Sequence, residues 1–157
     1  SGWKDRHLVC LTQKFADFLI AAEPQLQSDT KIQIVTPPQR SRASATRGFN
    51  PMAQLALEIK RRNSNIVFDA QAVFYKREPK DQRGLNLQER AENVAGAFGV
   101  NEISDLPIIV LDDVWTTGST AMQLVKAIAS PEQVSRILVL STAYKLTSKD
   151  VWKSGIT

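Results

Sequence analysis

The sequence has little of what marks several large classes of protein. Its 157 residues include a single cysteine, so no internal disulfide can form, which agrees with a reducing compartment. No stretch approaches the roughly 20 apolar residues of a membrane span, and the start lacks the pattern of a signal peptide. We therefore expect a cytoplasmic protein. A length of 157 residues with 43% hydrophobic residues suits one domain with a substantial core.

Two common nucleotide-binding loops are also absent. No G-x-x-x-x-G-K-[ST] sequence is present, which argues against a P-loop ATPase. None of the seven glycines lies two positions from another, which excludes the G-x-G-x-x-G loop of dinucleotide-binding folds. A strand that ends in acidic residues therefore needs another explanation in this chain.

Such a strand is the most informative feature of the sequence. The apolar run from Ile108 to Leu111 predicts a strand of a parallel sheet covered on both faces. It brings Asp112 and Asp113 to its carboxyl end, where open α/β sheets bind ligands. Carboxylates accept hydrogen bonds, so this pair suits the hydroxyls of a ribose or, less directly, Mg²⁺.

A turn and a helix follow the acidic pair. Ser119 or Thr120 is expected to cap the helix, whose N-terminus favours an anion. Gly118 allows a tight turn, and the hydroxyls of Thr116 and Thr117 add donors. The run predicts a site for a sugar phosphate. The simpler alternative is that the acidic pair only ends a strand and that an ordinary capped turn follows it.

This run resembles the motif with which type I phosphoribosyltransferases bind phosphoribosyl pyrophosphate (PRPP). That motif is an apolar strand, two acidic residues and a Thr-Thr-Gly-x-Thr loop. The resemblance implies that Asp112 and Asp113 hold the ribose hydroxyls and, indirectly, Mg²⁺. It also implies that the loop wraps the 5′-phosphate through Thr116, Thr117, Gly118, Ser119 and Thr120.

Two further segments are similar to ComF-type members of this family. Arg47-Gly48-Phe49-Asn50 resembles their Arg-Gly-Phe-Asn-Gln segment, although Pro51 replaces the glutamine and Val35-Thr36-Pro37-Pro38 replaces a Pro-Val-Pro sequence. The zinc ribbon of many ComF proteins cannot form from Cys10 alone. The other similar positions precede the PRPP strand in the family's order and spacing: Gln82, Leu85, Arg90, Asn93, Gly96, Ala97 and Phe98.

The resemblance implies a Mg²⁺-dependent transfer of phosphoribosyl from PRPP to an acceptor, usually a nitrogenous base, with Asp112, Asp113 and Arg83 in the catalytic set. It further implies PRPP contacts from Pro38, Arg47, Gly48, Arg77 and Arg90. The alternative is a non-catalytic sensor of PRPP or a nucleotide, or a competence factor associated with single-stranded DNA. A homo-oligomer also stays open.

The basic residues cluster more than a net charge of +4 suggests. They gather in two groups, Arg40, Arg42 and Arg47, then Lys76, Arg77, Lys80, Arg83 and Arg90. Cations beside a pyrophosphate explain such clusters. The second group falls in a long polar loop, residues 76–86, that suits a lid. Solvated loops, a nucleic-acid patch and, for Arg90, a bond to a helix end are the alternatives.

Alternating strands and helices predict an α/β fold, a single doubly wound and mainly parallel sheet flanked by helices, as in type I phosphoribosyltransferases. The domain spans 1–157, with a PRPP core at about 31–144 and a tail at 145–157. Expected helices are 5–22, amphipathic through Leu8, Leu11, Phe15, Phe18 and Ala22, one from 51 capped by Asn50, 87–98 stopped by Gly99, and a short one from Thr147. Expected strands are 32–36, 66–68, 72–75, 108–112 and 136–142.

Overall fold

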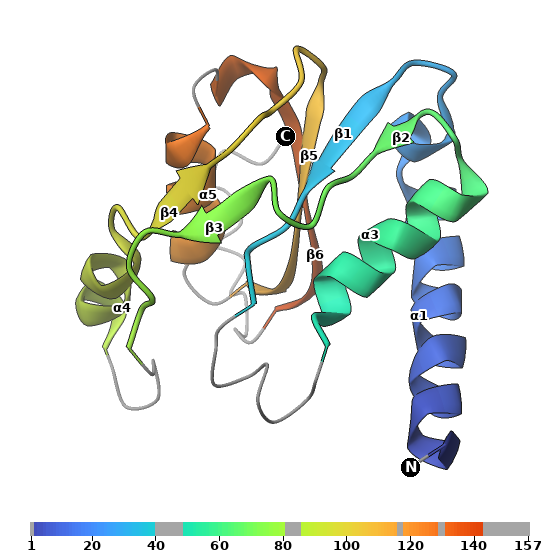
Figure 1. Cartoon of the computed structure of the whole chain (residues 1–157), viewed down its shortest axis with the longest axis horizontal. Coiled ribbons are helices and arrows are strands. Elements are labelled where there is room, and N and C mark those ends of the chain that lie inside the picture. Colours follow the sequence, from blue (N-terminus) through green and yellow to red (C-terminus); the bar gives the residue numbers. More distant parts are fainter. Residues whose placement is uncertain (1, 40–48, 81–85, 116–117, 129–130, 143–157) are drawn as a thin grey trace, which may run out of the picture.

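A parallel four-stranded sheet forms the centre of the fold (Figure 1). The computed structural model describes residues 2–39, 49–80, 86–115, 118–128 and 131–142. The sheet has the order β2-β1-β5-β6, and each neighbouring pair is parallel. Its strands are β1 (Ile32–Val35), β2 (Ile66–Val67), β5 (Ile108–Trp115) and β6 (Val134–Thr142). The prediction of an α/β protein with a mainly parallel sheet is confirmed.

Helices cover both faces of this sheet. Ile109 and Leu111 of β5 pack in the cluster that includes the first two long helices, whereas Ile108 and Val110 pack with the helix that follows β5. Burial on both faces explains why this strand is apolar at consecutive positions. The helices are α1 (Gly2–Ala22), η1 (Pro24–Gln27), α3 (Pro51–Arg62), α4 (Leu87–Val94), α5 (Ser119–Ala127) and η2 (Pro131–Gln133).

The start of α3 is set by its sequence. The Asn50 Oδ1 accepts hydrogen bonds from the backbone N–H groups of Met52 (3.0 Å) and Ala53 (3.3 Å), and Pro51 occupies the first helical position. This is the predicted cap. The predicted apolar face is also confirmed, because Met52, Leu55, Ala56 and Ile59 are buried.

The prediction of a helix through Phe98 is wrong. The helix α4 ends at Val94, and Gly96 has a φ of +61°, a left-handed conformation that breaks the helix. Residues Phe98–Val100 form β4, which pairs antiparallel with β3 (Val73–Tyr75). The Tyr75 and Phe98 rings stack with centroids 5.4 Å apart. The structure therefore has a second, two-stranded sheet that the single-sheet prediction missed.

The other boundaries shift by a few residues. The helix α1 begins at Gly2 rather than residue 5 and ends at Ala22 as expected. The last strand begins at Val134, two residues earlier than predicted. The helix expected from Thr147 lies outside the described residues.

The apolar face predicted for α1 is not its buried face. Leu11, Phe15 and Phe18 are 51%, 38% and 66% exposed, whereas Ala16 and Leu19 are buried. The helix carries two neighbouring apolar stripes, and the second one packs on the core. Spacing alone cannot show which of two such stripes is covered.

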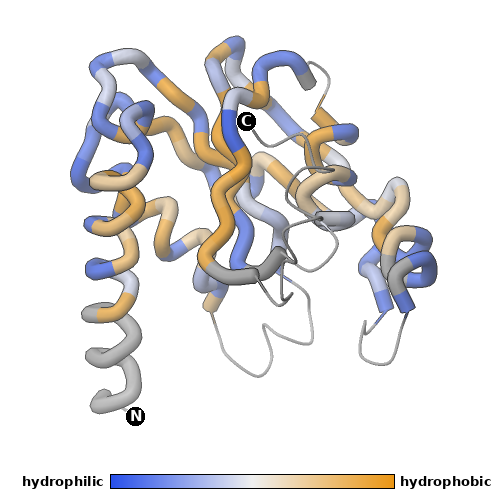
Figure 2. Tube along the Cα trace, turned by 180° about the vertical axis from the view of Figure 1, so that it is seen from behind, coloured by the Kyte–Doolittle hydropathy of each residue, from blue (hydrophilic) through white to orange (hydrophobic). Residues whose placement is uncertain are grey.

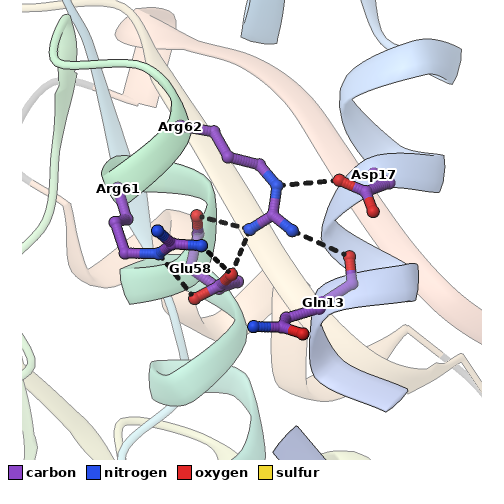
Figure 3. A network of polar contacts seen from close by, with 5 residues as sticks. All are labelled: Gln13, Asp17, Glu58, Arg61 and Arg62. Carbon is purple, nitrogen blue, oxygen red and sulfur yellow. Dashed lines mark hydrogen bonds and ion pairs between the residues drawn. The ribbon is translucent and has the colours of Figure 1, made fainter. Parts of the chain in front are cut away.

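A polar network joins α1 to α3 (Figure 3). Arg62 donates to Asp17 at 2.7 Å, to the backbone carbonyl of Gln13 at 3.4 Å, and to the Glu58 carboxylate. Arg61 donates to both Glu58 oxygens, at 2.9 and 3.2 Å. The hydrogen bond from Arg61, with that from Arg62 and the charges of both, lowers the pKa of Glu58 to about 2 against the opposing effect of burial.

Candidate functional site

The acidic pair lies at the carboxyl edge of the sheet, as predicted. The strand β1 ends at Val35, which is in register with Val110, so Asp112 lies beyond the end of β1. The prediction that β5 ends at the carboxylates is wrong, however, because the strand continues to Trp115 and pairs with β6 throughout. The acidic residues are therefore held by a strand that has a neighbour on one side only, and their other side adjoins the chain that leaves β1.

Asp112 is buried, with 8% of its surface exposed. Its Oδ1 accepts a hydrogen bond from the Asp113 backbone N–H at 2.9 Å. Burial raises the pKa of Asp112 from 3.8 to about 6, opposed by that hydrogen bond and reinforced by the charge and side chain of Asp113. Buried carboxyl groups with raised pKa values are typical of functional sites.

Asp113 is the exposed member of the pair. A hydrogen bond between the two side chains contributes to the raised pKa of Asp112, so the two carboxyl groups lie close together. A buried and an exposed carboxyl group side by side can accept hydrogen bonds from two neighbouring hydroxyl groups of one ligand.

The helix after the acidic pair begins differently from the prediction. Gly118 is the N-cap residue, with a φ of 69°, so Ser119 and Thr120 lie in the first turn instead of capping it. No side chain caps this helix, and Gly118 is itself buried. Since side chains often occupy the first N–H groups of a helix, an uncapped start leaves room for an anion. Thr116 and Thr117 lie outside the described residues.

The chain that leaves β1 returns to its starting point. The Gln39 Nε2 donates to the Phe49 carbonyl at 2.8 Å, and the Asn50 Nδ2 donates to the Pro37 carbonyl at 3.4 Å. Both ends of the connection to α3 are thereby tied together beside the carboxyl edge, next to the half-buried Pro38. Arg47 and Gly48 belong to the part of this connection outside the described residues.

Sequence reasoning missed this second role of Asn50. It identified Asn50 only as a helix cap, whereas its side-chain amide also holds the Pro37 carbonyl. The signal was present in the sequence, since an Asn cap has a free amide donor when its oxygen is used.

Arg77 bonds to a helix end. Its Nη2 donates to the backbone carbonyls of Asn93 (3.1 Å) and Ala95 (3.2 Å) at the end of α4. Asn93 in turn bonds the backbone of Lys80 with both its side-chain atoms, at 2.9 Å each. The structural role weighed for Arg90 is thus taken by Arg77. Arg83 and the side chain of Arg90 lie outside the description.

Mg²⁺ fits the acidic pair only as a shared ligand. Among the described residues no group of three or more His, Cys, Asp or Glu side chains could hold a metal ion. Two neighbouring carboxylates agree with the chemistry of Mg²⁺, which usually keeps several waters and binds through one or two carboxylates together with substrate phosphates. Asp112 and Asp113 would therefore hold the ion through a substrate or through water.

No protein-family model and no curated protein matches this sequence. In the part of the chain that the structure describes, no helix is both long enough and apolar enough to cross a membrane. The function has to be inferred from the residues of the carboxyl edge.

Proposed function

We propose that this protein binds PRPP at the carboxyl edge and transfers its phosphoribosyl group to a nitrogenous base, as a ComF-type phosphoribosyltransferase with a doubly wound fold. One observation carries the proposal: the adjacent Asp112 and Asp113 lie on a central parallel strand a few residues before a helix that starts at a left-handed glycine. That combination supplies acceptors for a ribose and donors for a phosphate.

The two parts of the site divide the ligand between them. Ribose hydroxyls donate to the carboxylates of Asp112 and Asp113, and the 5′-phosphate binds the first turn of α5, where the N–H groups of Ser119 and Thr120 lie. Bound hydroxyl donors stabilise the charged form of Asp112, so ligand binding lowers the pKa that burial raises.

The reaction needs little proton transfer at the sugar. A nitrogen of the acceptor forms a bond to C1 of PRPP as the bond from C1 to pyrophosphate breaks, and the electron pair leaves with pyrophosphate. Mg²⁺ and cationic side chains stabilise that leaving group. Arg47, Arg83 and Arg90 are our candidates for these cations, and Asp112 and Asp113 orient the ribose.

One observation favours a second candidate function, in which the protein binds PRPP or a nucleotide without transfer. Arg77 was expected beside pyrophosphate, but its guanidinium bonds to carbonyls at the end of α4. A site with fewer cations around the leaving group stabilises its departure less. A PRPP sensor would need the acidic pair and the phosphate loop but not these cations.

Calorimetry with PRPP and Mg²⁺ tests the shared part of both candidates. Asp113→Asn should weaken binding at least about tenfold, since it removes a charged acceptor worth roughly 1.5–3 kcal/mol. The exposed Asp29 supplies the matched control, and Asp29→Asn should bind like the wild type. Equal affinity of wild type and Asp113→Asn would contradict a PRPP site at this pair.

Pyrophosphate release with a panel of bases then separates the two candidates. Release that depends on one base supports the transferase. Tight PRPP binding with no release for any base supports the sensor.

A further inference from the structure

An exposed apolar stripe runs along one flank of α1. Its members are Leu11, Phe15 and Phe18, which are 51%, 38% and 66% exposed. Gln13 and Asp17 mark the opposite flank, because both bond to Arg62 of α3. At about 100° per residue, Phe15 lies roughly 160° around the helix from each of them. The stripe therefore faces away from α3.

The sheet has an open edge on the same side of the molecule. Among the described strands, β6 pairs only with β5, so the backbone groups of its other side have no strand beside them. Figure 2 looks onto this edge, with β6 running down the front and α1 beside it. The Glu23–Arg136 ion pair (3.6 Å) and the Ser135–Gln25 hydrogen bond (2.8 Å) join the chain just after α1 to the start of β6.

The exposed edge is long and apolar. It belongs to a nine-residue strand whose residues 137–140 are Ile-Leu-Val-Leu and are only partly buried. Proteins usually protect such an edge with charges, proline or a covering segment, because an unpaired apolar strand recruits another strand. Since backbone N–H and C=O groups need backbone partners, the complement of this edge is a strand.

We propose that a second copy of this chain covers both features. The β6 strands of two copies pair antiparallel across a two-fold axis perpendicular to the sheet, and the two α1 helices meet through the stripes of Leu11, Phe15 and Phe18. The uncharged run at 137–140 can lie opposite its own copy without setting like charges against each other. One symmetric contact thus covers the edge and the stripe together.

The dimensions agree with this arrangement. Strands in a sheet are about 4.8 Å apart, so a helix over the outermost pair of strands lies about 5 Å from such an axis. Two such helices are about 10 Å apart, the usual separation of packed helices. A nine-residue strand is roughly 30 Å long, and a patch of that length and similar width reaches the roughly 800 Å² per partner of a stable interface.

Sedimentation equilibrium on the full chain tests the proposal. The wild type should be a dimer of about 35 kDa at micromolar concentration, twice the 17.5 kDa of the chain. Phe18→Glu should raise the dimer dissociation constant at least tenfold, because it places two charges in an apolar contact. The matched control is Leu57→Glu on α3, a site 45% exposed and outside the stripe, which should leave the dimer intact.

Hydrogen exchange supplies a second measurement for the strand pairing. The outward-facing N–H groups of β6 should exchange more slowly in the wild type than in folded Phe18→Glu protein. A wild-type monomer at tens of micromolar would overturn the proposal. So would a monomer destabilised by Phe18→Glu, because the stripe would then be covered by residues 143–157 of the same chain.

Discussion

Two carboxyl groups on this small protein are shifted in opposite directions. Glu58, between α3 and α1, has its pKa lowered to about 2 by the hydrogen bonds and charges of Arg61 and Arg62. Asp112, at the carboxyl edge of the sheet, has its pKa raised to about 6 by burial next to another acid. The first group has all the partners it needs within the fold, whereas the second is buried as if a partner were still to come.

This difference separates a structural region from a functional one. A paired carboxylate contributes stability to the folded chain, while a buried and unpaired one costs stability unless it serves a ligand. Active sites commonly carry such costs. Substitutions at the two places should therefore move stability in opposite directions.

The largest effect is expected at Asp112. Its raised pKa means that the folded state keeps a proton up to about pH 6, whereas the unfolded chain releases it near pH 3.8. Stability from this group is therefore full below about pH 4 and falls as the pH rises through 6, by up to about 3 kcal/mol. Asp112→Asn should raise the free energy of unfolding at pH 8 by a similar amount and remove that part of the pH dependence.

Urea unfolding at pH 4, 6 and 8 measures this effect. Asp29→Asn is the control, since Asp29 is exposed and its neutralisation should change stability little. If Asp112→Asn destabilised the protein at pH 8, the carboxylate would be a satisfied structural group and the contrast with Glu58 would disappear.

A smaller effect of the opposite sign is expected at Arg62. Its side chain is 23% exposed and bonds Asp17, Glu58 and the Gln13 carbonyl, so Arg62→Ala should cost about 1–2 kcal/mol. Arg61 is the matched control, because it is 66% exposed and bonds only Glu58 within the network. Arg61→Ala should cost less than about 0.5 kcal/mol. Thermal unfolding of both variants measures the difference, and equal losses would mean that the bonds to α1 contribute nothing.

The sequence predicted the parts of the fold that depend on local chemistry. The Asn50-Pro51 helix start and the buried strand before Asp112 follow from capping and from apolar runs, and both are present. The helix expected through Phe98 failed because helical spacing continues across Gly96, whose left-handed conformation ends the helix.

The site was predictable only in part for a similar reason. The acidic pair could be placed at the sheet edge, since strand order alone decides it. The burial of Asp112 depends on β6 continuing alongside to Thr142, and the bonds of Arg77 depend on where α4 ends. Both are tertiary facts that residue types along the chain do not contain.

The most direct test of the PRPP site is an NMR titration of the Asp112 carboxyl carbon with and without PRPP and Mg²⁺. Without ligand the titration should show the raised pKa of Asp112, about 6. With saturating PRPP the pKa should fall by at least one unit, because ribose hydroxyls stabilise the carboxylate. A pKa of Asp112 that is the same with and without bound PRPP would contradict the account.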